Sequence, residues 1–208
     1  MFKKYYASLG IITPLVYLFA VVLGGFIMPN YSHTYNTISE LTGAGFPDIL
    51  ILDFLFILYN VLLVAFSIGG LVFFQPVKVR MARILFALLL AAGLIGLLFS
   101  FFPQDMRGAA PTASGKIHII LAGIISPVTV ASAILAGFTF KSDPIYQELS
   151  AFSFAMGAVI LATGGATAIS IAVDSPFGGI FERLTIGAFL VWFLFLAVKI
   201  NGKHQKEK

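Results

Sequence analysis

The stretch ILILDFLFILYNVLLVAFSIGGLVFF, residues 49–74, holds only one charged side chain, that of Asp53. Because a helix needs about 20 apolar residues to cross the roughly 30 Å hydrocarbon core of a bilayer, this stretch is long enough to span a membrane. Similar stretches predict five more transmembrane helices, at 9–28, 84–102, 117–140, 151–173 and 181–200. The sequence therefore predicts an all-α, polytopic membrane protein with six transmembrane helices in one bundle, forming a single domain over residues 1–208.

The composition supports this class. Hydrophobic residues make up 59% of the 208-residue chain and charged residues only 11%, which leaves too little polar surface for a water-soluble globule. The chain has no cysteine, so disulfides, thiolate metal sites and thiol catalysis are excluded. The net charge of +4 comes from basic residues close to the predicted spans, which suits contact with lipid headgroups and gives no sign of nucleic-acid binding.

The charges also predict an orientation. A six-span topology puts ten basic residues on one side of the membrane and three, Arg107, Lys116 and Arg183, on the other. Since cytoplasmic segments carry the excess of lysine and arginine, we expect both termini in the cytoplasm and the protein in the cell membrane. The acidic residues show the opposite bias. Those expected at or just below the outer surface are Glu40, Asp48, Asp53, Asp105, Asp174 and Glu182.

The first outer connection is expected to be structured. Thr37 and Glu40 have the spacing of a capping box, which predicts a short helix ending at Gly43 or Gly45. Asp48 is predicted to cap the start of the second span. A proline follows the end of each helix that runs outward, at Pro29, Pro103 and Pro176, and is expected to terminate it because proline lacks an amide proton.

Carboxylate, imidazole and guanidinium groups gather on the outer side, a combination that suits headgroup binding or acid–base chemistry. The residues predicted to bind a ligand are Ser39, Asp53, Arg107, Asp174, Glu182 and Arg183. In an enzyme, Asp105 and His118 would form an acid–base pair, and Glu40 would orient the pair or hold a metal. We expect Glu40, Asp105, His118, Glu182 and Arg183 to lie together, with Arg183 as the counter-charge.

No metal site and no cofactor are predicted. The sequence contains no metalloprotease, nucleophile-elbow, P-loop or dinucleotide motif. Two histidines on the outer side and no cysteine make a poor ligand set for zinc. A site rich in carboxylates would favour weak binding of Mg²⁺ or Ca²⁺ at most.

Polar residues inside the spans form two stripes. Asp53, Asn60 and Ser67 share one face of the second span, and Thr163, Thr167, Ser170 and Asp174 share one face of the fifth. The many small residues of the fifth span indicate close helix packing, which predicts a central place for it in the bundle. We expect the two stripes to face each other and to enclose a polar cavity open to the outside. A packed bundle without a cavity would satisfy the same groups.

Three groups of short strings occur in a distinctive order. They are TISEL at 37–41 with Gly43 and Pro47, FPQD at 102–105 followed by His118, and GIFERL at 179–184 followed by Trp192. Together they resemble the domain-of-unknown-function 998 family of six-span bacterial and archaeal membrane proteins, over nearly the whole chain. The resemblance implies a six-helix integral membrane protein whose family-typical positions are Ser39, Glu40, Asp105, His118, Glu182 and Arg183. It implies no reaction, and the additional cysteine or histidine that members often carry near the FPxD string is missing, which argues against a thiol or metal role.

Three functions fit these observations. In the first, the protein binds an amphiphilic small molecule or a lipid headgroup in an outward-facing polar cavity. In the second, it is a membrane-embedded hydrolase or transferase that acts at the outer leaflet through Asp105 and His118. In the third, it is a structural or interaction protein whose outer charges pair with one another.

Overall fold

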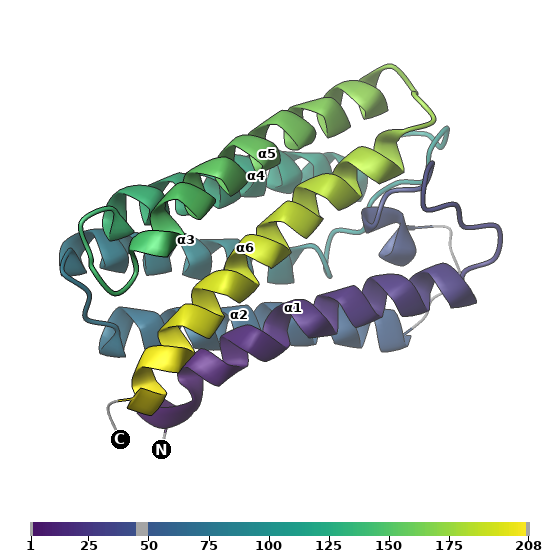
Figure 1. Ribbon diagram of the computed structural model, residues 1–208. Helices are drawn as coiled ribbons and strands as arrows, with labels where there is room; N and C mark the ends of the chain where they lie inside the picture. Colours follow the sequence, from purple (N-terminus) through teal and green to yellow (C-terminus); the bar gives the residue numbers. More distant parts are fainter. Residues whose placement is uncertain (1, 45–49, 207–208) are drawn as a thin grey trace.

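The computed structural model describes residues 2–44 and 50–206, and side chains for 5–44 and 50–202. Six α-helices run through these residues and a short 3₁₀-helix, η1, lies in the first long connection (Figure 1). Their bounds are α1 Phe2–Ile27, η1 Ser39–Thr42, α2 Leu50–Phe73, α3 Val79–Leu98, α4 Ala113–Phe140, α5 Gln147–Ala172 and α6 Gly178–Lys206. All six α-helices are long and apolar enough to cross a membrane, so the all-helical class and the six spans are confirmed.

The helix ends differ from the predicted spans in a consistent way. α3 ends at Leu98 and α5 at Ala172, four or five residues before the prolines that were predicted to terminate them. After the α3–α4 connection, α4 already begins at Ala113, because the side-chain oxygen of Thr112 caps it by accepting a hydrogen bond from the backbone N–H of Gly115. Hydropathy marks where the hydrocarbon begins, whereas a helix ends where its last backbone groups find other partners.

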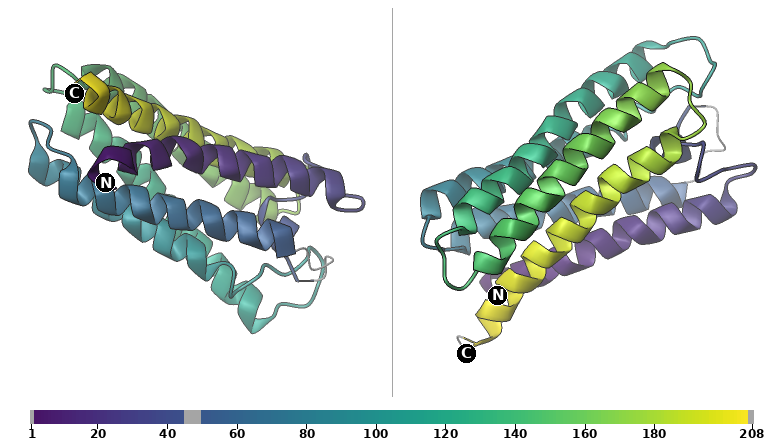
Figure 2. Two further views of the ribbon diagram at one scale, coloured as in Figure 1. Left: turned by 90° about the horizontal axis from the view of Figure 1, so that it is seen from below. Right: turned by 45° about the horizontal axis from the view of Figure 1, so that its top comes forward.

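The helices form a ring in chain order. Each helix packs against the next, and α6 returns to pack against α1. Both chain ends therefore lie side by side at one end of the bundle, here called the terminal end, as Figure 1 and Figure 2 show. The opposite end, here called the η1 end, carries η1 and the α1–α2, α3–α4 and α5–α6 connections.

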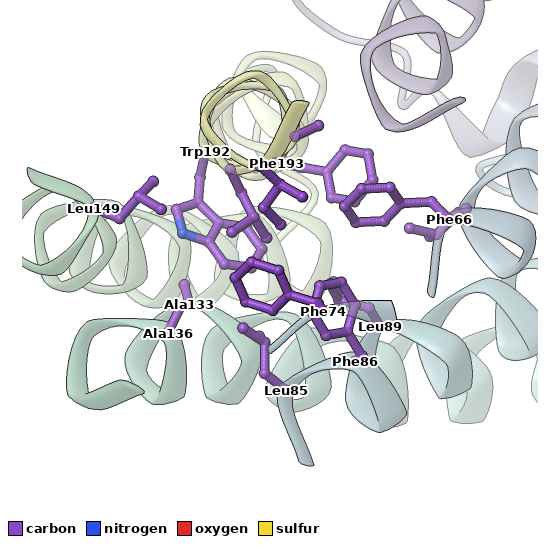
Figure 3. Close-up of a cluster of buried hydrophobic side chains, with 14 of the residues drawn as sticks. Phe66, Phe74, Leu85, Phe86, Leu89, Ala133, Ala136, Leu149, Trp192 and Phe193 are labelled. Carbon is purple, nitrogen blue, oxygen red and sulfur yellow. The ribbon is translucent and has the colours of Figure 1, made fainter. Parts of the chain in front are cut away.

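Aromatic side chains fill the inside of the ring (Figure 3). The rings of Phe66 and Phe193 lie edge to face with centroids 5.0 Å apart, and those of Phe74 and Phe86 at 5.6 Å. Trp192 is fully buried, and its indole N–H donates to the hydroxyl of Ser153 at 2.9 Å. Since a buried indole N–H needs a partner, this bond fixes α6 against α5.

The predicted central place of the fifth span is wrong. Within the described residues α5 packs only against α4 and α6, and the hydrophobic segment of α5 has a smaller buried share, 17%, than that of any other span. Its small residues are instead largely exposed to the surroundings, as Gly165 and Ala168 illustrate. Small residues permit close packing, but they do not by themselves show that a neighbouring helix is present.

The predicted facing of the two polar stripes is wrong as well. α2 and α5 make no contact in the described part of the chain. Thr163 and Thr167 lie against α6, where the hydroxyl of Thr185 donates to Thr163 Oγ1 at 3.0 Å. Asn60 packs instead against Gly96 of α3 and donates to the carbonyl of Phe56 at 2.9 Å. The packing of the described residues therefore does not support the predicted polar cavity between α2 and α5.

Candidate functional site at the η1 end

The α1–α2 connection is seated directly on the first turn of α6. A Cβ atom at Gly179 would lie 2.4 Å from the carbonyl oxygen of Asn36 and 2.8 Å from those of His33 and Thr34, so only glycine permits this approach. The N–H of Ile180 donates to the carbonyl of Thr34 at 3.2 Å. The connection thus supplies a partner for one of the free N–H groups at the start of α6.

Glu182 holds the start of η1. Its carboxylate accepts a hydrogen bond from the backbone N–H of Ile38 and another from the hydroxyl of Ser39 at 3.2 Å. Ser39 and Glu182, two of the predicted ligand-binding residues, therefore contact each other. Glu182 is half-buried, and a carboxylate that accepts backbone and hydroxyl hydrogen bonds is well suited to such a position.

Arg183 binds backbone carbonyls. Its Nη1 donates to His33 O at 2.7 Å and to Asn36 O at 2.8 Å, and its Nη2 donates to the Tyr31 hydroxyl at 2.5 Å. The hydrogen bonds found for Arg183 in the described residues go to carbonyl and hydroxyl oxygens, and its predicted role as the counter-charge of the acids stays a prediction. Burial raises the pKa of Tyr31 above its usual range, although Arg183 opposes the shift.

Glu40 forms half of the predicted capping box. Its Oε2 accepts from the backbone N–H of Thr37 at 3.1 Å and from the side-chain amide of Asn36 at 2.7 Å. Thr37 does not complete the box, since its hydroxyl has no partner among the described residues. η1 ends at Thr42 with Gly43 as its C-cap, one of the two glycines predicted to end it, whereas Gly45 and Asp48 lie outside the described residues.

Arg107 touches all three connections at this end. Its Nε lies 4.0 Å from Oε1 of Glu40, and its guanidinium sits over the ring of Tyr35, 4.1 Å from the centroid. Its Nη1 donates to the carbonyl of Ser175 at 3.1 Å and lies 3.5 Å from a carboxylate oxygen of Asp174. Arg107 is thus the residue through which the α1–α2, α3–α4 and α5–α6 connections meet.

Asp105 and His118 each have a local partner. Both carboxylate oxygens of Asp105 accept from Thr112, from its N–H at 2.8 Å and from its hydroxyl at 2.7 Å, and these bonds lower the pKa of Asp105. His118 Nδ1 lies 2.8 Å from the carbonyl of Phe102. Since a carbonyl only accepts, the proton of a neutral His118 ring is on Nδ1 and Nε2 is left as an acceptor.

The predicted residues therefore occupy one end of the bundle in two groups. The first group is Ser39, Glu40, Glu182 and Arg183, and the second is Asp105 and His118. Arg107 lies beside Glu40, and a backbone hydrogen bond from Ala44 N to Gln104 O at 2.9 Å joins the connections that carry the groups. Asp174 is at the exposed rim, 76% accessible, and Asp53 is half-buried in the first turn of α2.

The sequence did not single out Tyr31, Tyr35, Asn36 and Thr112, although each of them holds one of the predicted charges. Asn36 and Tyr31 lie within a connection that carries no lysine or arginine, and that composition was the one available signal. Among the described residues, no three histidine, aspartate or glutamate side chains are placed to share a metal ion.

The strings TISEL and GIFERL, which are far apart in the sequence, thus lie against each other in the structure. A family model described as "Protein of unknown function (DUF998)" matches residues 11–199, which include all these strings. No curated protein and no solved structure gives a significant match. The family match covers nearly the entire chain, and the chain therefore belongs to the DUF998 family of proteins of unknown function.

Proposed function

We propose that this membrane protein binds the polar headgroup of an amphiphile, a lipid or a small molecule, at its η1 end. One observation carries the proposal. In the described part of the chain, the buried side-chain atoms without a hydrogen-bond partner all belong to this end: Thr37 Oγ1, Glu40 Oε1, Arg107 Nη2 and Arg183 Nε. Because the large majority of buried polar atoms in proteins are hydrogen-bonded, such a concentration is typical of groups that bind a ligand.

The chemistry of these atoms restricts the ligand. An ionised Glu40 only accepts hydrogen bonds, whereas the guanidinium groups of Arg107 and Arg183 only donate them. A ligand that satisfies both kinds of group needs a hydrogen-bond donor, such as a hydroxyl or an ammonium, and acceptor oxygens, such as those of a hydroxyl, a phosphate or a carboxylate. Lipid headgroups and zwitterionic amphiphiles combine these groups.

The charge balance points to a headgroup without net charge. The two carboxylates Glu40 and Glu182 and the two guanidinium groups Arg107 and Arg183 sum to zero, whereas Asp174, 3.5 Å from Arg107, is 76% exposed and screened by solvent. An additional net charge at this place would have to be compensated, because uncompensated buried charge is costly. A zwitterionic or a hydroxyl-bearing neutral headgroup preserves the balance.

Arg107 is the entry point. Its side chain is 17% exposed, whereas that of Glu40 is fully buried. We expect a headgroup to bind Arg107 first and to reach Glu40 by replacing its weak 4.0 Å contact with the guanidinium. The acid–base alternative has less support, because Thr112 already occupies both carboxylate oxygens of Asp105.

We also propose that the termini face the cytoplasm, so that the η1 end meets the outer leaflet of the cell membrane. The excess of lysine and arginine at the terminal end supports this orientation.

Thermal unfolding of the purified protein in detergent tests the binding proposal. Lysophosphatidylethanolamine, which carries both an ammonium and a phosphate, is added to the micelles. A ligand that binds only the folded state raises Tm, so we expect an increase for the natural protein and none for Arg107→Gln. Lys116→Gln removes the same charge from an exposed position on the first turn of α4 and should keep the increase.

The outcomes separate binding from a purely structural role. If the charges only hold the connections together, Arg107→Gln will lower the Tm of the free protein and leave the lipid-dependent increase unchanged. That result, or an absent increase in the natural protein, refutes the proposal.

A further inference from the structure

An apolar groove of about 490 Å³ runs along the surface between α4 and α5. It is separate from the charged residues of the η1 end. Of the side chains that line it, only that of Ser126 is polar. Because α4 and α5 are membrane-spanning by length and hydropathy, the groove opens into the hydrocarbon of the bilayer.

Backbone chemistry on both walls explains why the helices leave this space. On α4, Pro127 lines the groove and cannot donate the helical hydrogen bond to the carbonyl of Gly123. On α5, Gly164 and Gly165 line it and contribute no side chain. A Cβ atom at Gly165 would meet no atom within 4 Å, so the groove is open at this point.

Two lysines lie beyond one end of the groove. Phe138 lines the groove on the last turns of α4, and its carbonyl oxygen accepts a hydrogen bond from Lys78 Nζ at 3.0 Å. Lys141 follows three residues later, about one helical turn further toward the terminal end, and is exposed. The nearby carboxylate of Asp143 accepts from the backbone N–H groups of Val77 and Ile145, each at 3.0 Å.

The two ammonium groups outnumber this single carboxylate, whose oxygens already have partners. The mouth of the groove therefore carries a net positive charge. An apolar channel with ammonium groups at its mouth matches a hydrocarbon chain joined to a phosphate.

The length of the groove indicates what kind of molecule it can bind. From Pro127 to Phe138 the helix rises by about 17 Å, at about 1.5 Å per residue. This length is close to half of the roughly 30 Å hydrocarbon core, which is the depth of one leaflet.

We propose that the groove binds one acyl chain of an anionic phospholipid from the leaflet at the terminal end, whose phosphate is bound by Lys78 and Lys141. The acyl chain lies along Pro127, Gly164 and Gly165, and the headgroup of the lipid lies beyond Phe138.

Native mass spectrometry of protein released from nanodiscs tests the groove. The nanodiscs contain equal parts of phosphatidylglycerol and phosphatidylcholine. We expect retained phosphatidylglycerol on the natural protein and its loss from Gly165→Leu, whose side chain fills the groove. Gly123→Leu is the matched control, since Gly123 is also open to space but lies on α4 outside the groove, and this variant should retain the lipid.

Substitution of the lysines tests the headgroup site. A lysine near the surface of an anionic leaflet contributes about a fivefold change in affinity, so Lys78→Gln and Lys141→Gln should each weaken retention by about that factor. Lys116→Gln, at the η1 end, should leave it unchanged. Circular dichroism verifies that each variant is folded.

The proposal is overturned if Gly165→Leu retains phosphatidylglycerol, or if Gly123→Leu loses it equally. It is also overturned if Gly165→Leu instead separates a dimer while lipid retention stays the same, because the groove would then hold a second copy of the chain.

Discussion

The carboxylate of Glu182 accepts a hydrogen bond from the backbone N–H of Ile38, which lies 144 residues earlier in the sequence. This bond joins the last helix to the first long connection, and the hydroxyl of Ser39 adds a second bond to the same carboxylate. Ile38 itself is only 5% exposed. Its N–H therefore depends on Glu182 for a partner, since water does not reach a group at this depth.

Glu182→Ala should destabilise the protein by about 1–3 kcal/mol, the usual cost of leaving a buried donor without a partner. The measurement is the unfolding of the purified protein in detergent. Glu148→Ala is the control, because the partner of that exposed carboxylate is Lys199 at the surface, and such pairs add little. Equal losses in the two variants would contradict the assigned role of Glu182.

Gly179→Ala should displace the α1–α2 connection, because the new Cβ would lie 2.4 Å from Asn36 O. We expect a lower Tm and faster proteolysis within residues 29–44. Gly187→Ala on the same helix meets no atom within 4 Å, and should be neutral or stabilising by up to about 1 kcal/mol through helix propensity. The idea fails if both alanine variants behave alike.

The stabilising effect of Asp105 should depend on pH. Hydrogen bonds from Thr112 hold its folded-state pKa below the ordinary value of 3.8. A carboxyl group with a lowered folded-state pKa stabilises the protein above the ordinary value, and loses this effect as the pH falls through the folded-state pKa. The difference in Tm between the natural protein and Asp105→Asn should thus be constant near neutral pH and shrink below about pH 4. A difference that does not change with pH would exclude this account.

The proposed orientation can be tested with single cysteines in this cysteine-free chain. Ser32→Cys and Ala110→Cys, both at exposed positions of the η1 end, should react with a membrane-impermeant thiol reagent in intact cells. Ser142→Cys, exposed at the terminal end, should react only after the cells are opened. Gly108 is a poor site for this purpose, because its φ of 78° strains any residue with a side chain. The opposite labelling pattern would reverse the orientation.

Sequence patterns predicted the features that depend on local chemistry. Hydropathy located all six spans, and the spacing of Thr37 and Glu40 identified the carboxylate that reaches back to a backbone N–H. Sequence patterns did not show which helices are neighbours. Small residues on α5 indicated close packing but did not identify the partner helix. Thr163 faces Thr185 of α6 rather than α2.

Only part of the charged site was predicted, because its contacts also depend on which segments are neighbours. The predicted acids and arginines that the structure describes, all except Asp48, lie at one end of the bundle. Their partners were not predicted, because Arg183 binds the carbonyls of His33 and Asn36, and backbone carbonyls leave no mark in a sequence. Contacts across 150 and 147 residues become visible only when the ring of helices is known.

The closure of that ring by α1 and α6 has a consequence for biosynthesis. α6 leaves the ribosome after the five helices before it, so the connection seated on Gly179 stays without its support until α6 is made. The N–H of Ile38 and the carbonyls of His33 and Asn36 must meanwhile remain in contact with water or lipid headgroups. Contacts this distant in sequence form late and slowly. A chain stopped before α6 would expose these backbone groups to membrane quality control.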